Sequence, residues 1–142
     1  MKQVVVVFVL LGLAGVAAGG CGASSRDVEG GDGDAILAAA LRDRVHDLRV
    51  QDRGIVARLL GDDTDGARHQ RFVLRLESGQ TLLVAHTIDV APRVDGLEVG
   101  ESVSFSGIYE WNAEGGTVHW THRDPDGKHA PGWIRHDAKT YQ

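Results

Sequence analysis

The chain is poor in cysteine, with a single one among its 142 residues. A single cysteine excludes a framework of intrachain disulfides and a zinc site made of several thiolates. Aromatic residues make up only 6% of the chain, and the formal net charge is −5. An acidic chain is a poor general binder of nucleic-acid phosphates, so we expect no general nucleic-acid binding. This length allows one modest domain and excludes a multidomain enzyme.

The first 20 residues are typical of an export signal. Lys2 precedes an apolar run from Val4 to Ala18, which is shorter than the roughly 20 residues of a transmembrane helix. Small residues then lead to Cys21, and this order resembles a bacterial lipoprotein signal, in which the cysteine becomes the lipidated N-terminus. We therefore expect Cys21 to anchor the protein to a membrane of the bacterial cell envelope, facing the periplasm or the outside. The alternative is an ordinary secretory signal and a soluble secreted protein.

Two short segments follow the signal. Residues 21–33 are rich in glycine and small polar residues, which predicts a flexible tether. Residues 34–48 predict a helix capped by Asp34, because apolar side chains recur at spacings of three and four. Residues 49–142 then form the predicted body of the protein.

Alternating hydrophobic residues predict a mainly β fold for that body. Phe72, Leu74 and Leu76 share one parity, and Ser78-Gly79 marks a two-residue hairpin. Five short strands in one small domain predict an OB-like barrel with an N-terminal helix, and an SH3-like barrel is the alternative. The strands are expected at residues 55–60, 71–77, 80–86, 102–111 and 117–122, with short closing pieces at 132–134 and 139–142. The pattern also allows the first strand to begin as early as Val50.

Histidine is the residue type that points to chemistry, because six of the seven lie after residue 68. Neutral imidazole is the commonest metal ligand, and the rim of a small barrel is a usual place for a ligand. His119 and His122 have opposite parity on one strand, so they meet only if the strand ends or bulges by Thr121. The alternative is that these are turn and surface residues. The candidate metal ligands are His86, His119, His122, Asp124 and His129, with His69 and His136 as secondary candidates.

No phosphate-binding loop, dinucleotide fingerprint or serine-nucleophile motif occurs in the chain. The leading hypothesis is a binding module of the cell envelope whose histidine-rich rim takes a metal ion, a small anionic ligand or a protein partner. Zinc is the expected ion, or another divalent transition metal, because imidazole and carboxylate are available without thiolate. One alternative is a metal-dependent hydrolase acting on phosphodiesters, and another is a structural interaction protein of the envelope.

Several motifs together resemble a bacterial domain-of-unknown-function family, number 3465. They are residues 69–72 (HQRF), 79–86 (GQTLLVAH), 88–93 (IDVAPR), 119–125 (HWTHRDP), 132–134 (GWI) and 139–142 (KTYQ). The resemblance covers roughly residues 50–142, so it takes in nearly all of the predicted body. It implies a small exported bacterial protein and assigns no catalytic residues.

Overall fold

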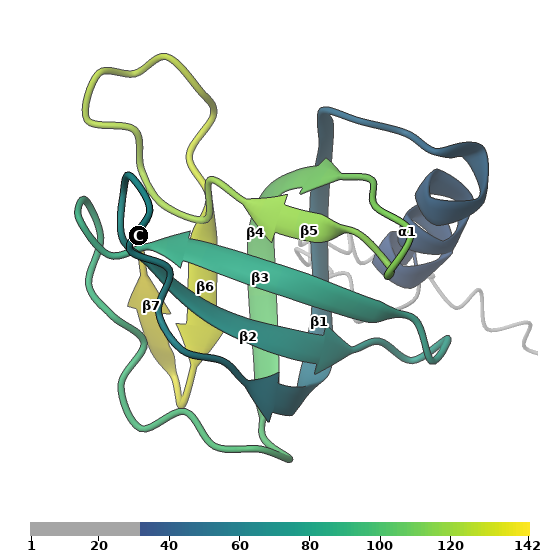
Figure 1. The fold of residues 1–142 in the computed structure, drawn as a ribbon, viewed down its shortest axis with the longest axis horizontal. Coiled ribbons are helices and arrows are strands. Elements are labelled where there is room, and N and C mark those ends of the chain that lie inside the picture. Colours follow the sequence, from purple (N-terminus) through teal and green to yellow (C-terminus); the bar gives the residue numbers. More distant parts are fainter. Residues whose placement is uncertain (1–31) are drawn as a thin grey trace, which may run out of the picture.

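A computed structural model describes residues 32–142 (Figure 1). The predictions for residues 1–31, which include the signal, most of the tether and Cys21, lie outside this range. Between residues 32 and 142, no helix is long and apolar enough to cross a membrane. One helix precedes seven strands: α1 (Asp32–Asp43), β1 (Leu48–Leu59), β2 (His69–Arg75), β3 (Thr81–Thr87), β4 (Ser102–Glu110), β5 (Thr117–His119), β6 (Trp133–His136) and β7 (Lys139–Tyr141).

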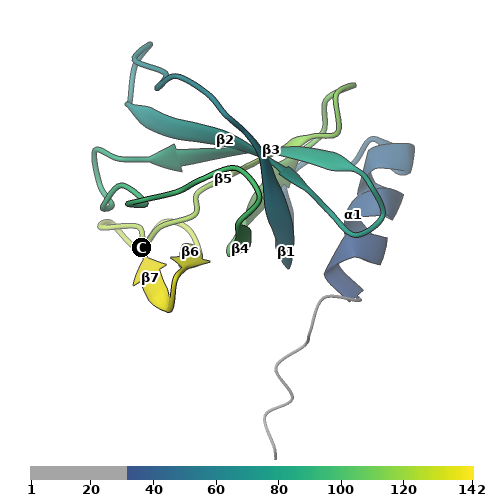
Figure 2. The same cartoon turned by 90° about the horizontal axis from the view of Figure 1, so that it is seen from below.

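The first five strands close into a barrel in the order β1-β2-β3-β5-β4, with β4 returning to β1. β1 is antiparallel to both β2 and β4, whereas β3 and β5 are parallel. This is the strand order of an OB-type barrel, so the predicted OB-like fold is confirmed. β6 and β7 form an additional hairpin, which Figure 2 shows beside β4.

One edge of β4 pairs with two strands in succession. Residues 108–110 of β4 pair with β5, and residues 104–106 pair with β6. Gly107 lies between these two sets of partners, and a Cβ atom there would come within 2.5 Å of the carbonyl oxygen of His119. Glycine therefore allows the end of β5 to pass close to β4 at the point where the chain leaves the barrel.

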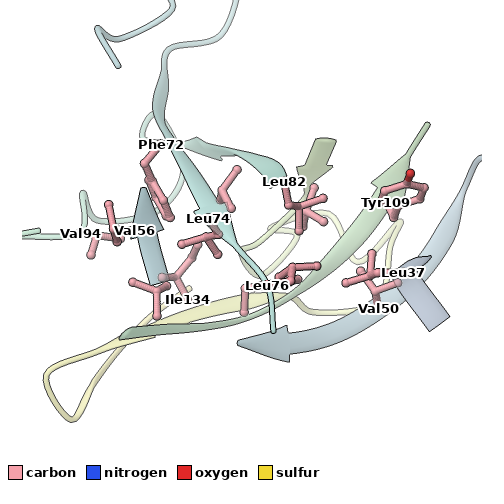
Figure 3. Close-up of a cluster of buried hydrophobic side chains, with 14 of the residues drawn as sticks. Leu37, Val50, Val56, Phe72, Leu74, Leu76, Leu82, Val94, Tyr109 and Ile134 are labelled. Carbon is pink, nitrogen blue, oxygen red and sulfur yellow. The ribbon is translucent and has the colours of Figure 1, made fainter. Parts of the chain in front are cut away.

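The barrel interior follows the predicted parity. Phe72, Leu74 and Leu76 are buried, as are Phe105 and Tyr109 on β4. Figure 3 shows Leu37 of α1 near Val50 and Tyr109 at one end of this core, and Val94 near Phe72 at the other. Full burial of one such apolar side chain contributes about 1.5–3 kcal/mol.

Helix α1 begins two residues before the predicted range of 34–48 and ends five residues before its end. Arg44 adopts a φ of 55°, and the N–H of Val45 donates to the carbonyl of Ala40 at 2.9 Å, which is the geometry of a Schellman cap. Asp34 lies within the helix, and its carboxylate accepts the N–H and the hydroxyl of Ser78, both at 2.6 Å. Asp34 therefore attaches α1 to the β2–β3 turn.

Candidate functional site

The candidate site is the 119–132 segment, which leaves the barrel at the end of β5 and returns at β6. Trp120 has a φ of 55°, so β5 ends before it and does not reach His122 as predicted. The N–H of Gly132 donates to the carbonyl of His122 at 2.9 Å and closes the base of the segment. In Figure 1 this segment, in yellow-green, projects from the side of the barrel opposite α1.

His122 and His129 form an imidazole pair within this segment. Their ring centroids lie 5.1 Å apart, and the ring planes are nearly perpendicular. Nδ1 of His122 lies 2.7 Å from the carbonyl oxygen of Arg123, and Nδ1 of His129 lies 2.8 Å from that of Ala130. A carbonyl oxygen only accepts, so each Nδ1 must carry its proton. The Nε2 atom of each neutral ring therefore keeps a lone pair for a ligand.

An exposed indole holds the ring of His129 in place. Trp120 is 42% exposed, and its ring lies 4.4 Å from that of His129 at a tilt of 33°. Trp120 also contacts His119, whose ring centroid lies 5.4 Å from that of the indole. The left-handed backbone at Trp120 therefore brings His119, His129 and His122 into one row of ring contacts. His119 and His122 were expected to approach only if the strand ended or bulged by Thr121, and β5 ends at His119.

Asp124 organises the backbone of the segment. Its carboxylate accepts the N–H of Asp126 at 2.9 Å, the N–H of Lys128, and the N–H of His129 at 3.0 Å. These donors, with that of Asp126 foremost, hold the pKa of Asp124 below its usual value. Asp124 therefore positions His129, and both of its oxygens are already engaged by backbone donors.

His86 is buried and supports the site from inside the barrel. Its Nε2 lies 2.9 Å from the carbonyl oxygen of Pro92 and therefore donates. Its Nδ1 lies 2.8 Å from Oγ1 of Thr121 and accepts from that hydroxyl. Burial lowers the pKa of His86 and favours this neutral form. With both nitrogens engaged, His86 links β3, the β3–β4 connection and the 119–132 segment.

His119 and His69 are not part of the imidazole pair. Nε2 of His119 is buried and lies 4.0 Å from Oε1 of Glu110. Burial lowers the pKa of His119, although Glu110 opposes this effect. His69 begins β2 and is close enough to contribute to lowering the pKa of both His86 and His119. Glu110 also binds Nδ1 of His46 at 2.8 Å, a pairing across 64 residues that no local spacing indicates.

The five predicted metal ligands do not form one coordination shell in this conformation. Within residues 32–142, only Glu101, His136 and Asp137 place three such ligand atoms within 4.8 Å of one another. His86 and Asp124 have hydrogen-bonding roles instead, and His122 and His129 remain as a pair. Metal binding by this pair therefore stays a prediction.

A groove of about 380 Å³ lies elsewhere, on the outer face of β1, β2 and β3 beside the β4–β5 connection. Val73 and Leu83 line it, together with Arg58 and Glu114. No histidine lines this groove, so it is separate from the imidazole pair.

Comparison of the sequence with known proteins places the chain in a family. A search of curated proteins found no match. Comparison with protein-family models matches residues 24–142 to the family described as "Protein of unknown function (DUF3465)". The match confirms the resemblance found in residues 50–142 and extends it to include α1. The chain belongs to the DUF3465 family.

Proposed function

We propose that this protein is a lipid-anchored module of the bacterial cell envelope that binds a divalent transition metal ion through His122 and His129. The observation that carries the proposal is the pair of hydrogen bonds from each Nδ1 to a backbone carbonyl. Histidines that ligate metals almost always donate their other ring N–H to such an acceptor, which fixes the tautomer and the orientation of the ring. Both Nε2 atoms are thereby prepared as ligands.

The surroundings of the pair favour binding without a large cost of ordering side chains. His122 is only 7% exposed, the ring of His129 packs against that of Trp120, and the backbone N–H of His129 donates to the carboxylate of Asp124. A side chain that is already fixed loses less rotamer freedom when it binds a ligand. Imidazole ligands suit zinc, copper and nickel, and zinc is the ion chosen for the test.

A binding role is favoured over hydrolysis by the number of ligands that the pair supplies. A catalytic zinc ion is usually held by three protein ligands and keeps one position for water. Two imidazoles leave two or more positions for water or for a ligand, which suits an exchangeable ion. Measurement of phosphodiester hydrolysis in the presence of zinc tests the alternative directly, and no cleavage is expected.

The experiment is a zinc titration of the protein, purified without a histidine tag, in competition with a chromophoric chelator. Replacing His129→Gln should weaken zinc binding at the pair at least tenfold, because one of two ligands is lost. His46→Gln is the matched control, since His46 is exposed and pairs with Glu110. If the wild-type and His129→Gln proteins bound the same number of zinc ions with the same affinities, the proposed site would be overturned.

The location is tested separately from the metal. Lipidation of Cys21 would hold the chain at a membrane, because each buried methylene of a lipid contributes about 0.8 kcal/mol. Cys21→Ser should therefore move the protein from the membrane fraction to the soluble fraction. A mutant that fractionates like the wild-type protein would contradict the lipid anchor and leave the metal site unaffected.

A further inference from the structure

A second group of ligand-bearing residues lies away from the 119–132 segment, where the hairpin of β6 and β7 meets the start of β4. Nε2 of His136 lies 2.7 Å from Oε2 of Glu101 and 3.7 Å from Oδ2 of Asp137. The side chain of His136 is 2% exposed, whereas that of Asp137 is 77% exposed. An imidazole at the base of the group thus faces two carboxylates that remain open to solvent.

We propose that Glu101, His136 and Asp137 form a site for a divalent metal ion, with zinc as its best-suited occupant. One imidazole nitrogen and two carboxylate oxygens are a ligand set that zinc accepts. A neutral imidazole and two ionised carboxylates carry a charge of −2, which balances the charge of the ion. This site is independent of the imidazole pair and uses none of its residues.

Hydrogen bonding alone leaves this group incompletely satisfied. Nε2 of His136 donates its proton to Oε2 of Glu101 at 2.7 Å, and Nδ1 of the same ring is buried without a hydrogen-bond partner within residues 32–142. Zinc binding at Nε2 displaces that proton, which moves to Nδ1 and leaves the ring neutral. Asp137 lies at 3.7 Å, beyond an ordinary hydrogen bond, although its carboxylate lies close to the same nitrogen. A cation between the three atoms would contact all of them at once.

The distances require only small movements. With zinc–ligand bonds of about 2.0–2.2 Å, neighbouring ligand atoms of a tetrahedral site lie about 3.3–3.6 Å apart. Glu101 must therefore withdraw from Nε2 by roughly 0.6–0.9 Å, whereas Asp137 must approach by about 0.1–0.4 Å. Glu101 is partly exposed and Asp137 occupies an open hairpin turn, so both side chains have room to move. The N–H of Glu98 also donates to Oε2 of Glu101 at 2.8 Å and orients this carboxylate.

An ion at this site would join two parts of the fold. Glu101 directly precedes β4, whereas His136 ends β6 and Asp137 begins the turn to β7. Binding would therefore hold the β6–β7 hairpin against the β3–β4 connection. Because the ion binds the folded arrangement, zinc should raise the temperature of unfolding.

The test uses the His129→Gln protein, so that zinc at the imidazole pair does not obscure the result. Into this protein we would introduce Glu101→Gln and, separately, Asp137→Asn. Asparagine tolerates the φ of 46° at position 137, so the turn is kept while the charge is removed. Asp65→Asn is the matched control, because Asp65 is an exposed loop aspartate outside the group. Circular dichroism checks that each variant is folded.

Zinc is then titrated alone, and both the affinity and the temperature of unfolding are measured. The His129→Gln protein should bind zinc and gain thermal stability, and Asp65→Asn should leave both effects unchanged. Glu101→Gln and Asp137→Asn should each weaken binding at least tenfold and reduce the thermal shift. Zinc binding of equal strength in these two variants, or none in the His129→Gln protein, would overturn the site.

Discussion

Nδ1 of His86 lies 2.8 Å from Oγ1 of Thr121, and this bond connects the barrel interior to the segment that carries the imidazole pair. Thr121 is fully buried and lies between Trp120 and His122 in the chain. Nε2 of His86 donates its proton to the carbonyl oxygen of Pro92. Nδ1 therefore acts as an acceptor, and the hydroxyl of Thr121 is its donor. The backbone around His122 is therefore fixed partly from inside the barrel.

Replacing Thr121→Val should destabilise the protein by about 1–3 kcal/mol, because valine has nearly the same shape and leaves Nδ1 of His86 buried without a partner. Urea unfolding measures this loss. Thr140→Val is the matched control, since Thr140 is exposed on β7. Equal unfolding free energies for the wild-type and Thr121→Val proteins would mean that the bond to His86 contributes nothing.

The free energy of unfolding should fall as the pH decreases from about 7.5 to about 5. Burial lowers the pKa of His86 and of His119 below the ordinary value of 6.5 in the folded protein. As the pH falls through that ordinary value, the unfolded chain takes up protons that the folded chain does not. Protonation therefore favours unfolding, and the stability present at neutral pH is lost in this range.

Urea unfolding at a series of pH values checks this dependence, with His86→Gln as the comparison. That variant should be less stable at neutral pH but should lose less stability on acidification. A wild-type protein whose stability is constant or rises as the pH falls from neutrality would show that the two histidines do not titrate as described.

Replacing Gly132→Ala should disrupt the base of the 119–132 segment. A Cβ atom at this position would lie 2.1 Å from the carbonyl oxygen of Trp120 and 2.6 Å from that of Ser106, and neither backbone can move cheaply. Overpacking of this kind costs about 1–3 kcal/mol. The variant should also bind zinc more weakly at the pair, because Gly132 donates to the carbonyl of His122.

Gly61→Ala is the control for this change, because a Cβ atom at Gly61 meets no atom within 4 Å. Thermal unfolding and zinc titration of both variants give the comparison. If Gly132→Ala and Gly61→Ala behaved alike in both measurements, the close packing at Gly132 would have no role in the site.

The side chain of Gln70 attaches the β3–β4 connection to the barrel. Its amide donates to the carbonyl of Val94 at 3.0 Å and accepts the N–H of the same residue at 2.8 Å. Methionine has a volume similar to that of glutamine but makes neither hydrogen bond, so Gln70→Met leaves both backbone groups of Val94 buried without these partners. The free energy of unfolding should therefore fall by about 2–3 kcal/mol. Gln51→Met, at an exposed position of β1, should change the unfolding free energy far less.

Much of the fold was predictable because it depends on local periodicity. The alternation through Phe72, Leu74 and Leu76 specifies both the strand and its buried face, and each predicted strand appears with shifted ends. The ends differ where tertiary contacts decide them. Helix α1 stops at an arginine with positive φ rather than at a glycine, and β5 stops at Trp120 for the same backbone reason. Neither residue type signals a left-handed conformation.

The candidate site was predictable as a region and not as a set of ligands. The density of histidines after residue 118 indicated the 119–132 segment, which holds the imidazole pair. The separate roles of His86 and Asp124 follow from Thr121, Pro92 and the backbone of the loop, and these contacts have no periodic signature. The approach of His136 to Glu101 likewise depends on the pairing of β6 with β4, which brings together residues 35 positions apart.

The most direct test of the imidazole pair is a long-range proton–nitrogen NMR spectrum of the histidine rings with and without zinc. In the metal-free protein at neutral pH, the tautomers of His122 and His129 should carry the proton on Nδ1. Addition of zinc should shift the Nε2 resonances of both rings, and those of His86 should keep the pattern of a ring protonated on Nε2. Unchanged Nε2 resonances of His122 and His129 at saturating zinc would contradict the proposed function.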